Sequence, residues 1–335
     1  MSDVRGGDAL FGVERLSLRI GDAQILDDVT WSVAPGETLG VVGESGSGKS
    51  MSVLAATGLL PRARSVLLEG RSYLGGDRPV ENLLALDPQR LRRLRGPRVG
   101  FVFQDPATSL NPLLSVERQL TEGLEEHRGL TRRAARTRAL ELLDLVGIPD
   151  PERRLAAYPH QLSGGMRQRI MIAIALSCDP EVLIADEPTT ALDVTIQAQI
   201  TDVVADLQRR LGTAVVWITH DLGVVGAVAD RIAVLYGGQV VETGTVRDLF
   251  ADSRHPYTRG LLASRPRIGH RGDELATIPG SPPDPRRLPP GCVFYDRCPI
   301  RSDARCATER PPLAQPAGAS ERHLVRSYCA EGAAS

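Results

Sequence analysis

The sequence predicts an α/β protein with a mixed sheet core, a helical subdomain and a small Cys-rich C-terminal extension. Three features predict this organisation. A buried strand at Thr38–Val42 leads through a glycine-rich loop into a helix that begins at Lys49. A second apolar strand, Glu181–Asp186, ends in acidic residues. After about Thr245 the chain becomes rich in proline and cysteine.

The composition is that of an ordinary globular protein. Of the 335 residues, 42% are hydrophobic and 24% charged, which excludes fibrous and wholly disordered chains. The 40 basic residues nearly balance the 41 acidic ones, so we expect no nucleic-acid partner. No apolar run reaches the ~18 residues of a membrane span. The first residues lack the pattern of a secretory signal, and we therefore expect a soluble, cytosolic protein.

Lys49 is the only lysine, since every other basic residue is arginine. A coding bias that replaces lysine by arginine explains this pattern wherever a generic positive charge suffices. The two side chains are not equivalent where a compact ammonium must enter a small loop. The surviving lysine therefore marks a position where a guanidinium would not serve.

The residues around this lysine fit the phosphate-loop pattern G-x-x-x-x-G-K-[ST] at every fixed position, namely Gly43, Glu44, Ser45, Gly46, Ser47, Gly48, Lys49 and Ser50. The glycines allow successive N–H groups to point at phosphate oxygens, and the helix start adds positive charge. We expect Lys49 to reach the β- and γ-phosphates of a nucleotide, Ser50 to bind Mg²⁺, and Met51 to lie among the nucleotide contacts. The loop alone leaves kinases, GTPases and motor ATPases open.

The acidic end of the second strand supplies the remaining chemistry. Asp186 at the carboxyl end of a core strand can hold Mg²⁺ beside the phosphate loop. Glu187 points in another direction and can polarise the attacking water. The alternative is an Asp-Glu pair that only caps the next segment. Two adjacent acids after a buried strand are costly unless a cation lies there, which favours the catalytic interpretation.

The segment Leu162–Arg169 reads LSGGMRQR and precedes an apolar helix and the acidic strand. It resembles the signature motif of ATP-binding-cassette (ABC) ATPases, which are P-loop NTPases. Gln104 matches the family's Q-loop glutamine, Ala191-Leu192-Asp193 its D-loop, and His220 its switch histidine. The motifs occur in the family's order over residues 13–245.

The resemblance implies a head-to-tail dimer. In such a dimer Ser163, Gly164 and Gly165 of one chain complete the ATP site of the other, and Asp193 lies close to the nucleotide. These residues start a helix and would form a second anion-binding nest. Such a nest has no phosphate of its own unless another subunit supplies it.

The resemblance also implies that Gln104 contacts Mg²⁺ or the water, and that His220 hydrogen-bonds the γ-phosphate and holds Glu187. One position departs from the family. Where an aromatic ring usually stacks on adenine, this chain has Ile20, which loses about 1 kcal/mol of stacking. A neighbouring ring such as Phe11 is a possible substitute.

Helical periodicity predicts a helical subdomain at about 106–175, whose Arg-rich segment is expected to form a solvated face. A helix is predicted over Leu192–Leu211 and ends at Gly212, with an apolar stripe formed by Ile196, Ile200, Val204, Leu207 and Leu211. A hairpin, Ile232–Tyr236 and Gln239–Glu242, closes an ATPase domain placed at residues 8–250.

The extension, residues 251–335, is too poor in apolar residues to fold unaided. Its four cysteines suggest a metal, because disulfides are disfavoured in the cytosol. Four thiolates suit Zn²⁺ or an iron–sulfur cluster, and their wide spacing favours [4Fe–4S]; they are Cys292, Cys298, Cys306 and Cys329. Cys178, in an apolar helix, is expected to be core packing.

The extension has a resemblance of its own. Arg254–Leu262, followed by IPGSPP and GCVFYDRCP, resembles the C-terminal extension of oligopeptide/dipeptide-type ABC importer ATPases, some of which carry a [4Fe–4S] cluster on these cysteines. This implies an ATPase subunit at the cytoplasmic face of the membrane, with a paralogous second ATPase subunit, two permeases and an extracytoplasmic solute-binding protein. The alternative is a soluble ABC ATPase of a non-transport complex.

Overall fold

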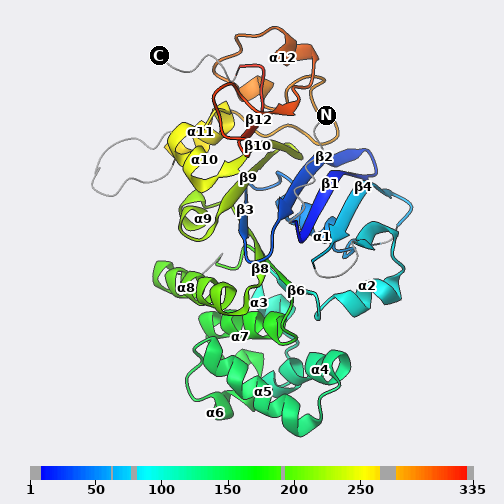
Figure 1. Ribbon diagram of the computed structural model, residues 1–335, viewed down its shortest axis with the longest axis vertical. Helices are drawn as coiled ribbons and strands as arrows, with labels where there is room; N and C mark the ends of the chain where they lie inside the picture. The colour runs from blue at the N-terminus through cyan, green and yellow to red at the C-terminus, as the bar shows by residue number, and fades with distance from the viewer. Residues whose placement is uncertain (1–8, 62, 77–80, 190–192, 265–276, 330–335) are drawn as a thin grey trace. The chain divides into compact units, whose positions relative to one another are not determined.

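The computed structural model describes residues 9–61, 63–76, 81–189, 193–264 and 277–329 (Figure 1). Within these residues the chain forms two compact units. The helical unit comprises 33–37 and 85–218, and the phosphate-loop unit comprises 9–32, 38–84 and the part from 219 onward. Among the described helices, none has the length and apolar character needed to cross a membrane.

The helical unit contains three parallel strands in the order β8-β7-β6. They are β6 (Val99–Val102), β7 (Val182–Asp186) and β8 (Ala214–Thr219). Every residue of β7 and β8 is buried, which explains their nearly continuous apolar sequences. Val102 lies opposite Ala185, so the carboxyl ends of β6 and β7 meet at one edge.

The remaining elements of this unit are helical, and the predicted helical subdomain is confirmed as α3 to α7 (Figure 1). Several helices begin at a residue whose side-chain oxygen accepts a backbone N–H, as in the caps Ser115 and Thr131. The helices are α2 (Pro88–Leu94), α3 (Pro106–Ser109), α4 (Val116–Arg128), α5 (Arg132–Leu145), α6 (Pro151–Leu155), α7 (Gly164–Leu176) and α8 (Val194–Leu211), with a 3₁₀ turn at Pro159–Gln161.

Helix α8 confirms most of its predicted stripe. Ile200, Val204 and Leu207 are buried, whereas Leu211 is 40% exposed, so its inclusion in the stripe was wrong. Leu211 is the last residue of the helix. Gly212 then adopts φ +66 and donates its N–H to Gln208 O, which confirms the predicted stop. Leu192, the predicted start, lies outside the described residues.

The phosphate-loop unit contains two groups of paired strands. The first has the order β2-β1-β4-β5, with β4 antiparallel to both β1 and β5: β1 (Phe11–Ile20), β2 (Ala23–Val33), β4 (Val66–Leu74) and β5 (Glu81–Asn82). The second has the order β11-β12-β10-β9-β3: β3 (Thr38–Val42), β9 (Arg231–Tyr236), β10 (Gln239–Thr245), β11 (Leu313–Ala314) and β12 (Leu324–Arg326). Strand β3 is parallel to β9, and β9 antiparallel to β10, which confirms the mixed sheet and the predicted hairpin.

The Cys-rich extension adds strands to this sheet. Val325 of β12 lies opposite Glu242 of β10, and β11 pairs with β12. Strand pairing therefore attaches a segment whose own composition could not build a core. The helices of the unit are α1 (Lys49–Ala56), α9 (Leu222–Val228), α10 (Val246–Asp252), α11 (Pro256–Ala263) and α12 (Arg305–Thr308), with 3₁₀ turns at Leu83–Ala85 and Tyr295–Arg297.

Candidate active site

The phosphate loop connects β3 to α1, as predicted. Its last glycine, Gly48, precedes α1 with φ +100, and a Cβ there would lie 2.8 Å from Leu26 Cδ2. Only glycine meets both conditions without strain. The next residue, Lys49, is 5% exposed, and its Nζ donates to Gly43 O at 2.8 Å and to Glu44 O at 2.9 Å. The loop thus wraps around its own ammonium group.

The other loop residues differ in exposure. Ser45 and Gly46 are exposed, whereas Ser50 and Met51 are half-buried at the start of α1. Glu44 is held from outside the loop. Its carboxylate receives two hydrogen bonds from Arg297, and its N–H donates to the hydroxyl of Tyr257. Nothing local in the sequence indicated these two contacts.

The acidic strand end lies in the helical unit. Asp186, the last residue of β7, is 6% exposed. Glu187 follows with φ +47, and its N–H donates to Ile218 O at 2.9 Å. A non-glycine residue in the left-handed region is strained, and such strain gathers at functional sites.

Gln104 and Glu187 are brought together. Gln104 follows β6, the strand that pairs with β7, and its Nε2 donates to Glu187 Oε2 at 3.0 Å. The meeting of these strand ends explains how residues far apart in sequence come into contact. The contact orients the glutamate carboxylate and aims the carbonyl oxygen of the glutamine elsewhere.

The signature segment starts α7. Ser163 caps the helix, its Oγ accepting from Met166 N at 3.3 Å, and both Ser163 and Gly164 are exposed. A Cβ on Gly165 would lie 3.0 Å from Ile196 Cγ2, so the tight packing of α7 near α8 favours glycine. The N-terminal N–H groups of α7 are therefore presented on an exposed surface.

Two predicted residues lie at other helix starts. Asp193 caps α8, its Oδ1 accepting from Ile196 N at 2.9 Å. The preceding D-loop residues, Ala191 and Leu192, lie outside the described residues. His220 follows β8 and is exposed. The phosphate loop and His220 belong to one unit, whereas Gln104, Asp186, Glu187, Asp193 and the signature segment belong to the other.

The predicted adenine contacts lie on β1. Ile20, its last residue, is 36% exposed and is accessible to a ligand. Phe11 is fully buried, and its ring packs edge-on against Trp31 at a centroid distance of 5.5 Å. The suggestion that Phe11 replaces the missing aromatic ring is therefore wrong, because that ring is part of the core.

The four cysteines of the extension do not form a recognisable metal site. Within the described residues, which include all four, no three His, Cys, Asp or Glu side chains gather as a ligand set. Cys306 Sγ and Cys329 Sγ are 3.5 Å apart. Tetrahedral zinc with 2.3 Å bonds needs about 3.8 Å between every pair of four sulfurs. Burial raises the pKa of Cys292 to about 11, and burial together with the neighbouring Cys329 raises that of Cys306.

Cys178 is 2% exposed and packs in the core, as predicted, although it lies just beyond the end of α7. Its Sγ is 3.5 Å from Gly123 O. Burial raises the pKa of this thiol, which keeps it protonated and unreactive.

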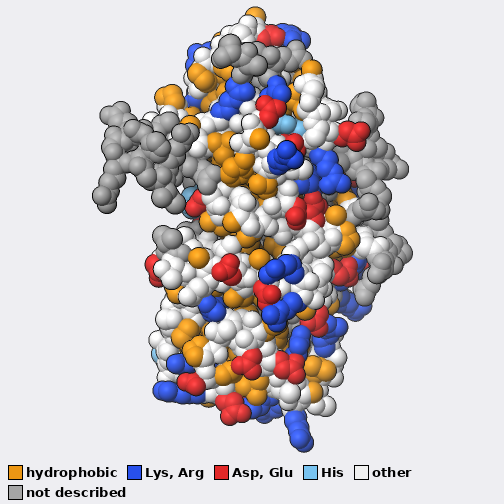
Figure 2. Space-filling view, turned by 60° about the vertical axis from the view of Figure 1, so that its left-hand side comes forward, with side chains coloured by type: hydrophobic (Ala, Val, Ile, Leu, Met, Phe, Trp, Pro, Cys, Tyr) orange, Lys and Arg blue, Asp and Glu red, His pale blue; other side chains and the backbone are white. Residues whose placement is uncertain are grey.

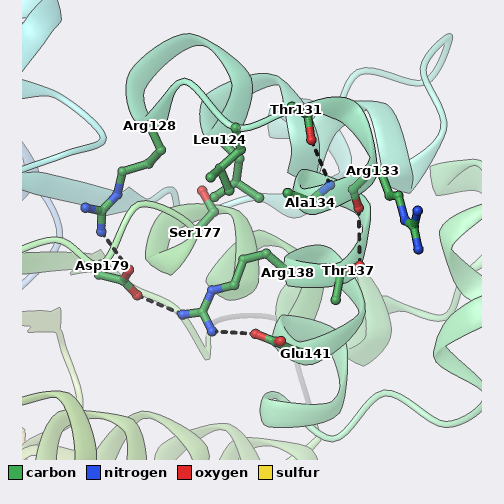
Figure 3. A pocket seen from close by; sticks show the side chains of 11 residues that line it. Leu124, Arg128, Thr131, Arg133, Ala134, Thr137, Arg138, Glu141, Ser177 and Asp179 are labelled. Carbon is green, nitrogen blue, oxygen red and sulfur yellow. Dashed lines mark hydrogen bonds and ion pairs between the residues drawn. The ribbon is translucent and has the colours of Figure 1, made fainter.

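A separate hollow of about 660 Å³ lies between α4, α5 and the end of α7, and none of the predicted nucleotide residues lines it (Figure 3). Asp179 is bound there by Arg128 at 2.6 Å and by Arg138 at 2.8 Å, and Arg138 also binds Glu141. Within the Arg-rich segment Arg132, Arg133 and Arg136 are exposed, as expected of a solvated face, and Arg138 is half-buried. On the face shown in Figure 2, basic and acidic side chains are interspersed over the lower, helical part rather than gathered by sign.

Comparisons with known proteins agree with this arrangement. Residues 26–190 match the "ABC transporter" family, and residues 241–306 match "Oligopeptide/dipeptide transporter, C-terminal region". The chain is 48% identical over 309 residues to the oligopeptide transport ATP-binding protein OppD of Bacillus subtilis (strain 168), covering 92% of this chain and 84% of that protein.

Solved structures show the same fold. The cassette MJ0796, described as a dimer in a post-hydrolysis state with ADP and Pi, is 31% identical with a TM-score of 0.62 and covers 71% of this chain and 99% of its own. The protein cbiO1 of Clostridium perfringens, part of the complex cbiONQ, is 28% identical with a TM-score of 0.62, covering 73% of this chain and 92% of its own. The chain is an ATPase of the ABC transporter family, and it belongs to the branch that carries the oligopeptide/dipeptide transporter C-terminal region.

Proposed function

We propose that the chain is the ATP-hydrolysing subunit of a bacterial importer that carries di- or oligopeptides, or a related small solute, through partner permeases. One observation supports this most strongly. The similarity to an oligopeptide transport ATP-binding protein extends over 92% of the chain and so includes both the phosphate loop and the C-terminal region.

Binding of ATP is assigned to the phosphate loop. Backbone N–H groups of Gly43–Ser50 would surround the phosphates, with Met51 close by and Ile20 as a weak contact to adenine. The carbonyls of Gly43 and Glu44 hold Lys49 in place, so that its ammonium is positioned to meet the β- and γ-phosphates when ATP enters. The loop geometry supports this role because Lys49 is already inside the loop.

Hydrolysis is assigned to the strand end. Glu187 orients a water molecule and accepts its proton. The water oxygen bonds to the γ-phosphorus while the bond from this phosphorus to the bridging β-phosphate oxygen breaks, and ADP leaves with the electrons of that bond. The Gln104 contact holds the glutamate ready. Mg²⁺, with Ser50, Asp186 and the Gln104 carbonyl oxygen as ligands, would neutralise phosphate charge.

A second ATPase subunit completes each site in this proposal. Ser163, Gly164 and Gly165 would bind the γ-phosphate held by the partner's loop, with Asp193 near the junction and His220 bonded to the phosphate and to Glu187. The exposed start of α7 and the dimeric state reported for MJ0796 support this. A paralogous second subunit is proposed rather than an identical one.

The other partners follow from the importer assignment. They are two permeases, contacted through the helical subdomain at about 106–175, and an extracytoplasmic solute-binding protein. The chain would then lie peripherally on the cytoplasmic face of the membrane. The proposed boundaries are residues 8–250 for the ATPase domain and 251–335 for the extension. No nucleic-acid partner is proposed, because the net charge is only -1.

A [4Fe–4S] cluster on the four cysteines of the extension, with Zn²⁺ as the alternative, stays a prediction from the resemblance alone. The thiol arrangement described above does not support it. Iron and zinc analysis of anaerobically purified protein decides the matter. About four irons per chain would support the cluster, whereas metal-free protein with ordinary stability would remove it.

The function is tested in the cell that encodes the chain. Replacing the gene by the Glu187→Gln variant should abolish uptake of labelled di- and tripeptides while the purified variant still binds ATP. Glu69→Gln, a change to an exposed acid on β4, serves as the control. Normal uptake with Glu187→Gln would show that the chain serves a complex other than a peptide importer. Undiminished ATP hydrolysis by the variant would instead refute the role of Glu187.

A further inference from the structure

Glu44, the second residue of the phosphate loop, is bound by an arginine of the C-terminal region. Arg297 Nη1 donates to Glu44 Oε2 at 2.7 Å, and Nη2 donates to Oε1 at 3.1 Å. The Arg297 side chain is only 5% exposed and the Glu44 side chain 26% exposed. Two parallel hydrogen bonds in a largely buried place fix both the orientation of the Glu44 carboxylate and its distance from the Arg297 guanidinium.

The orientation of Arg297 is itself determined by its surroundings. Its Nε donates to Pro279 O at 2.9 Å, Nη2 donates also to Ile278 O at 3.0 Å, and Nη1 donates to the Tyr236 hydroxyl at 3.3 Å. Together with the two bonds to Glu44, these contacts use all five guanidinium N–H groups. The arginine therefore has one orientation, and its two hydrogen bonds hold the Glu44 carboxylate in a matching position.

A second contact reaches the backbone of the same loop residue. Glu44 N–H donates to the Tyr257 hydroxyl at 2.8 Å. Tyr257 is fully buried, with its ring 4.5 Å from Tyr236 and 5.5 Å from Phe294 between centroids. This aromatic cluster, formed by Tyr236, Tyr257 and Phe294, belongs to β9, α11 and the turn before Tyr295–Arg297.

The contacts act on Lys49 through one peptide unit. The carbonyl oxygens of Gly43 and Glu44 accept from Lys49 Nζ at 2.8 and 2.9 Å. The Glu44 N–H shares its peptide plane with the Gly43 carbonyl, so the Tyr257 bond orients an oxygen that holds the lysine. The pairing with Arg297 also neutralises a carboxylate next to the place where phosphate anions would bind.

We propose that Arg297 and Tyr257 are positioning residues that keep the phosphate loop in its nucleotide-binding form, so that the C-terminal region sets the nucleotide affinity of the chain. This inference rests on the proposed role of Gly43–Ser50 in ATP binding. A loop with glycine at positions 43, 46 and 48 loses much conformational entropy when it is ordered. Contacts from residues outside the loop order it in advance, so less of the nucleotide's binding free energy is used for that ordering.

The test measures binding of Mg²⁺–ADP to the full chain by calorimetry. Tyr257→Phe keeps the ring and removes only the hydroxyl acceptor, and it should raise Kd about 5-fold, as expected for one hydrogen bond. Arg297→Met should raise Kd about 10-fold or more, and Arg297→Lys should recover part of that loss. In ATP hydrolysis Tyr257→Phe and Arg297→Met should both raise KM and keep kcat within about twofold of wild type, because the lost contacts weaken binding of substrate and of transition state equally.

The matched control is Arg310→Met. Arg310 belongs to the same region and binds Asp27 at 2.9 Å and Asp28 at 3.2 Å on β2 instead of the loop. It should lower thermal stability and leave the Kd for ADP unchanged. Adding Glu44→Gln to Arg297→Met should not weaken binding further, because the unpaired carboxylate is then removed.

Unchanged ADP affinity in Tyr257→Phe and Arg297→Met would overturn the inference, as would an equal loss in Arg310→Met. If Arg297→Met does not fold, the isosteric Tyr257→Phe decides alone. Lys49→Ala distinguishes a failure of the proposed nucleotide site from a failure of the positioning role. Wild-type affinity in Lys49→Ala would refute the proposed binding site itself. Loss of binding in Lys49→Ala alone would refute only the positioning role.

Discussion

Lowering the pH should destabilise the C-terminal region through His255. The imidazole is 1% exposed, its Nδ1 accepts from Tyr257 N at 3.1 Å, and its ring lies 5.7 Å from that of Phe294. Burial lowers the pKa of His255 from 6.5 to about 4, with a smaller opposing effect of Glu242 and a reinforcing effect of Arg326. The folded chain therefore holds this ring neutral where the unfolded chain would protonate it.

The sign and size of the stability change follow from the difference in proton binding between the folded and unfolded states. Because the pKa of His255 is lower in the folded state, the unfolded state binds more protons between pH 6.5 and about 4, and stability falls as the pH falls through that window. At 1.36 kcal/mol per unit of pKa, the loss reaches about 2 kcal/mol at pH 5 and is nearly zero at pH 7. For a domain of this size that corresponds to ~4–8 °C in Tm.

The assay compares the thermal unfolding of three proteins between pH 7.5 and pH 5. His255→Asn keeps a side-chain acceptor for the start of α11 and removes the titrating ring, so its Tm should fall by ~4–8 °C less than that of the wild type over this range. His160→Asn, which changes an exposed ring, should follow the wild type. Parallel curves for wild type and His255→Asn would refute the argument that the buried ring is kept neutral.

Two further substitutions test packing in the helical unit. In Gly100→Ala the new Cβ would overlap the Ala175 carbonyl oxygen and lie 3.0 Å from Pro180 Cγ, so we expect a loss of ~1–3 kcal/mol in urea unfolding; stability equal to wild type would show that β6 can shift. Arg98→Met removes two hydrogen bonds to the Glu181 carboxylate, from Nε and Nη2, each 2.7 Å long. It should lower the free energy of unfolding by ~2 kcal/mol in the same assay, and this loss should vanish when Glu181→Gln is already present.

The sequence predicted best what short segments determine. Strand Thr38–Val42 and helix α1 follow from one apolar run and one glycine-rich loop, and both were confirmed. The stop at Gly212 follows from the left-handed backbone that glycine adopts without strain. The contact between Gln104 and Glu187 was not predicted, although both residues follow parallel neighbouring strands whose carboxyl ends meet at one edge.

Predictions about single side chains failed where burial depends on distant partners. Phe11 was suggested as a substitute ring near Ile20, but it lies at the opposite end of β1 and is buried against Trp31. Leu211 has the right spacing for the apolar stripe of α8 and still lies exposed in the last turn. Helical spacing predicts which residues share a face, and it contains no information on how far the neighbouring elements extend over that face.

The extension shows most clearly why composition was an incomplete guide. Its prolines and few apolar residues suggested that a bound metal must hold it together. The structure shows attachments that composition did not indicate, namely strand β12 on β10 and the buried pair His323–Glu242, whose Nε2 and Oε1 atoms are 2.8 Å apart. The same docking brings Arg297 to Glu44 across 253 residues, a pairing that no local pattern could indicate. Arg297 and Tyr257 contact the phosphate loop itself, whereas Arg310 attaches the same segment to β2. Removing Arg297 or Tyr257 should therefore weaken nucleotide binding before the chain unfolds.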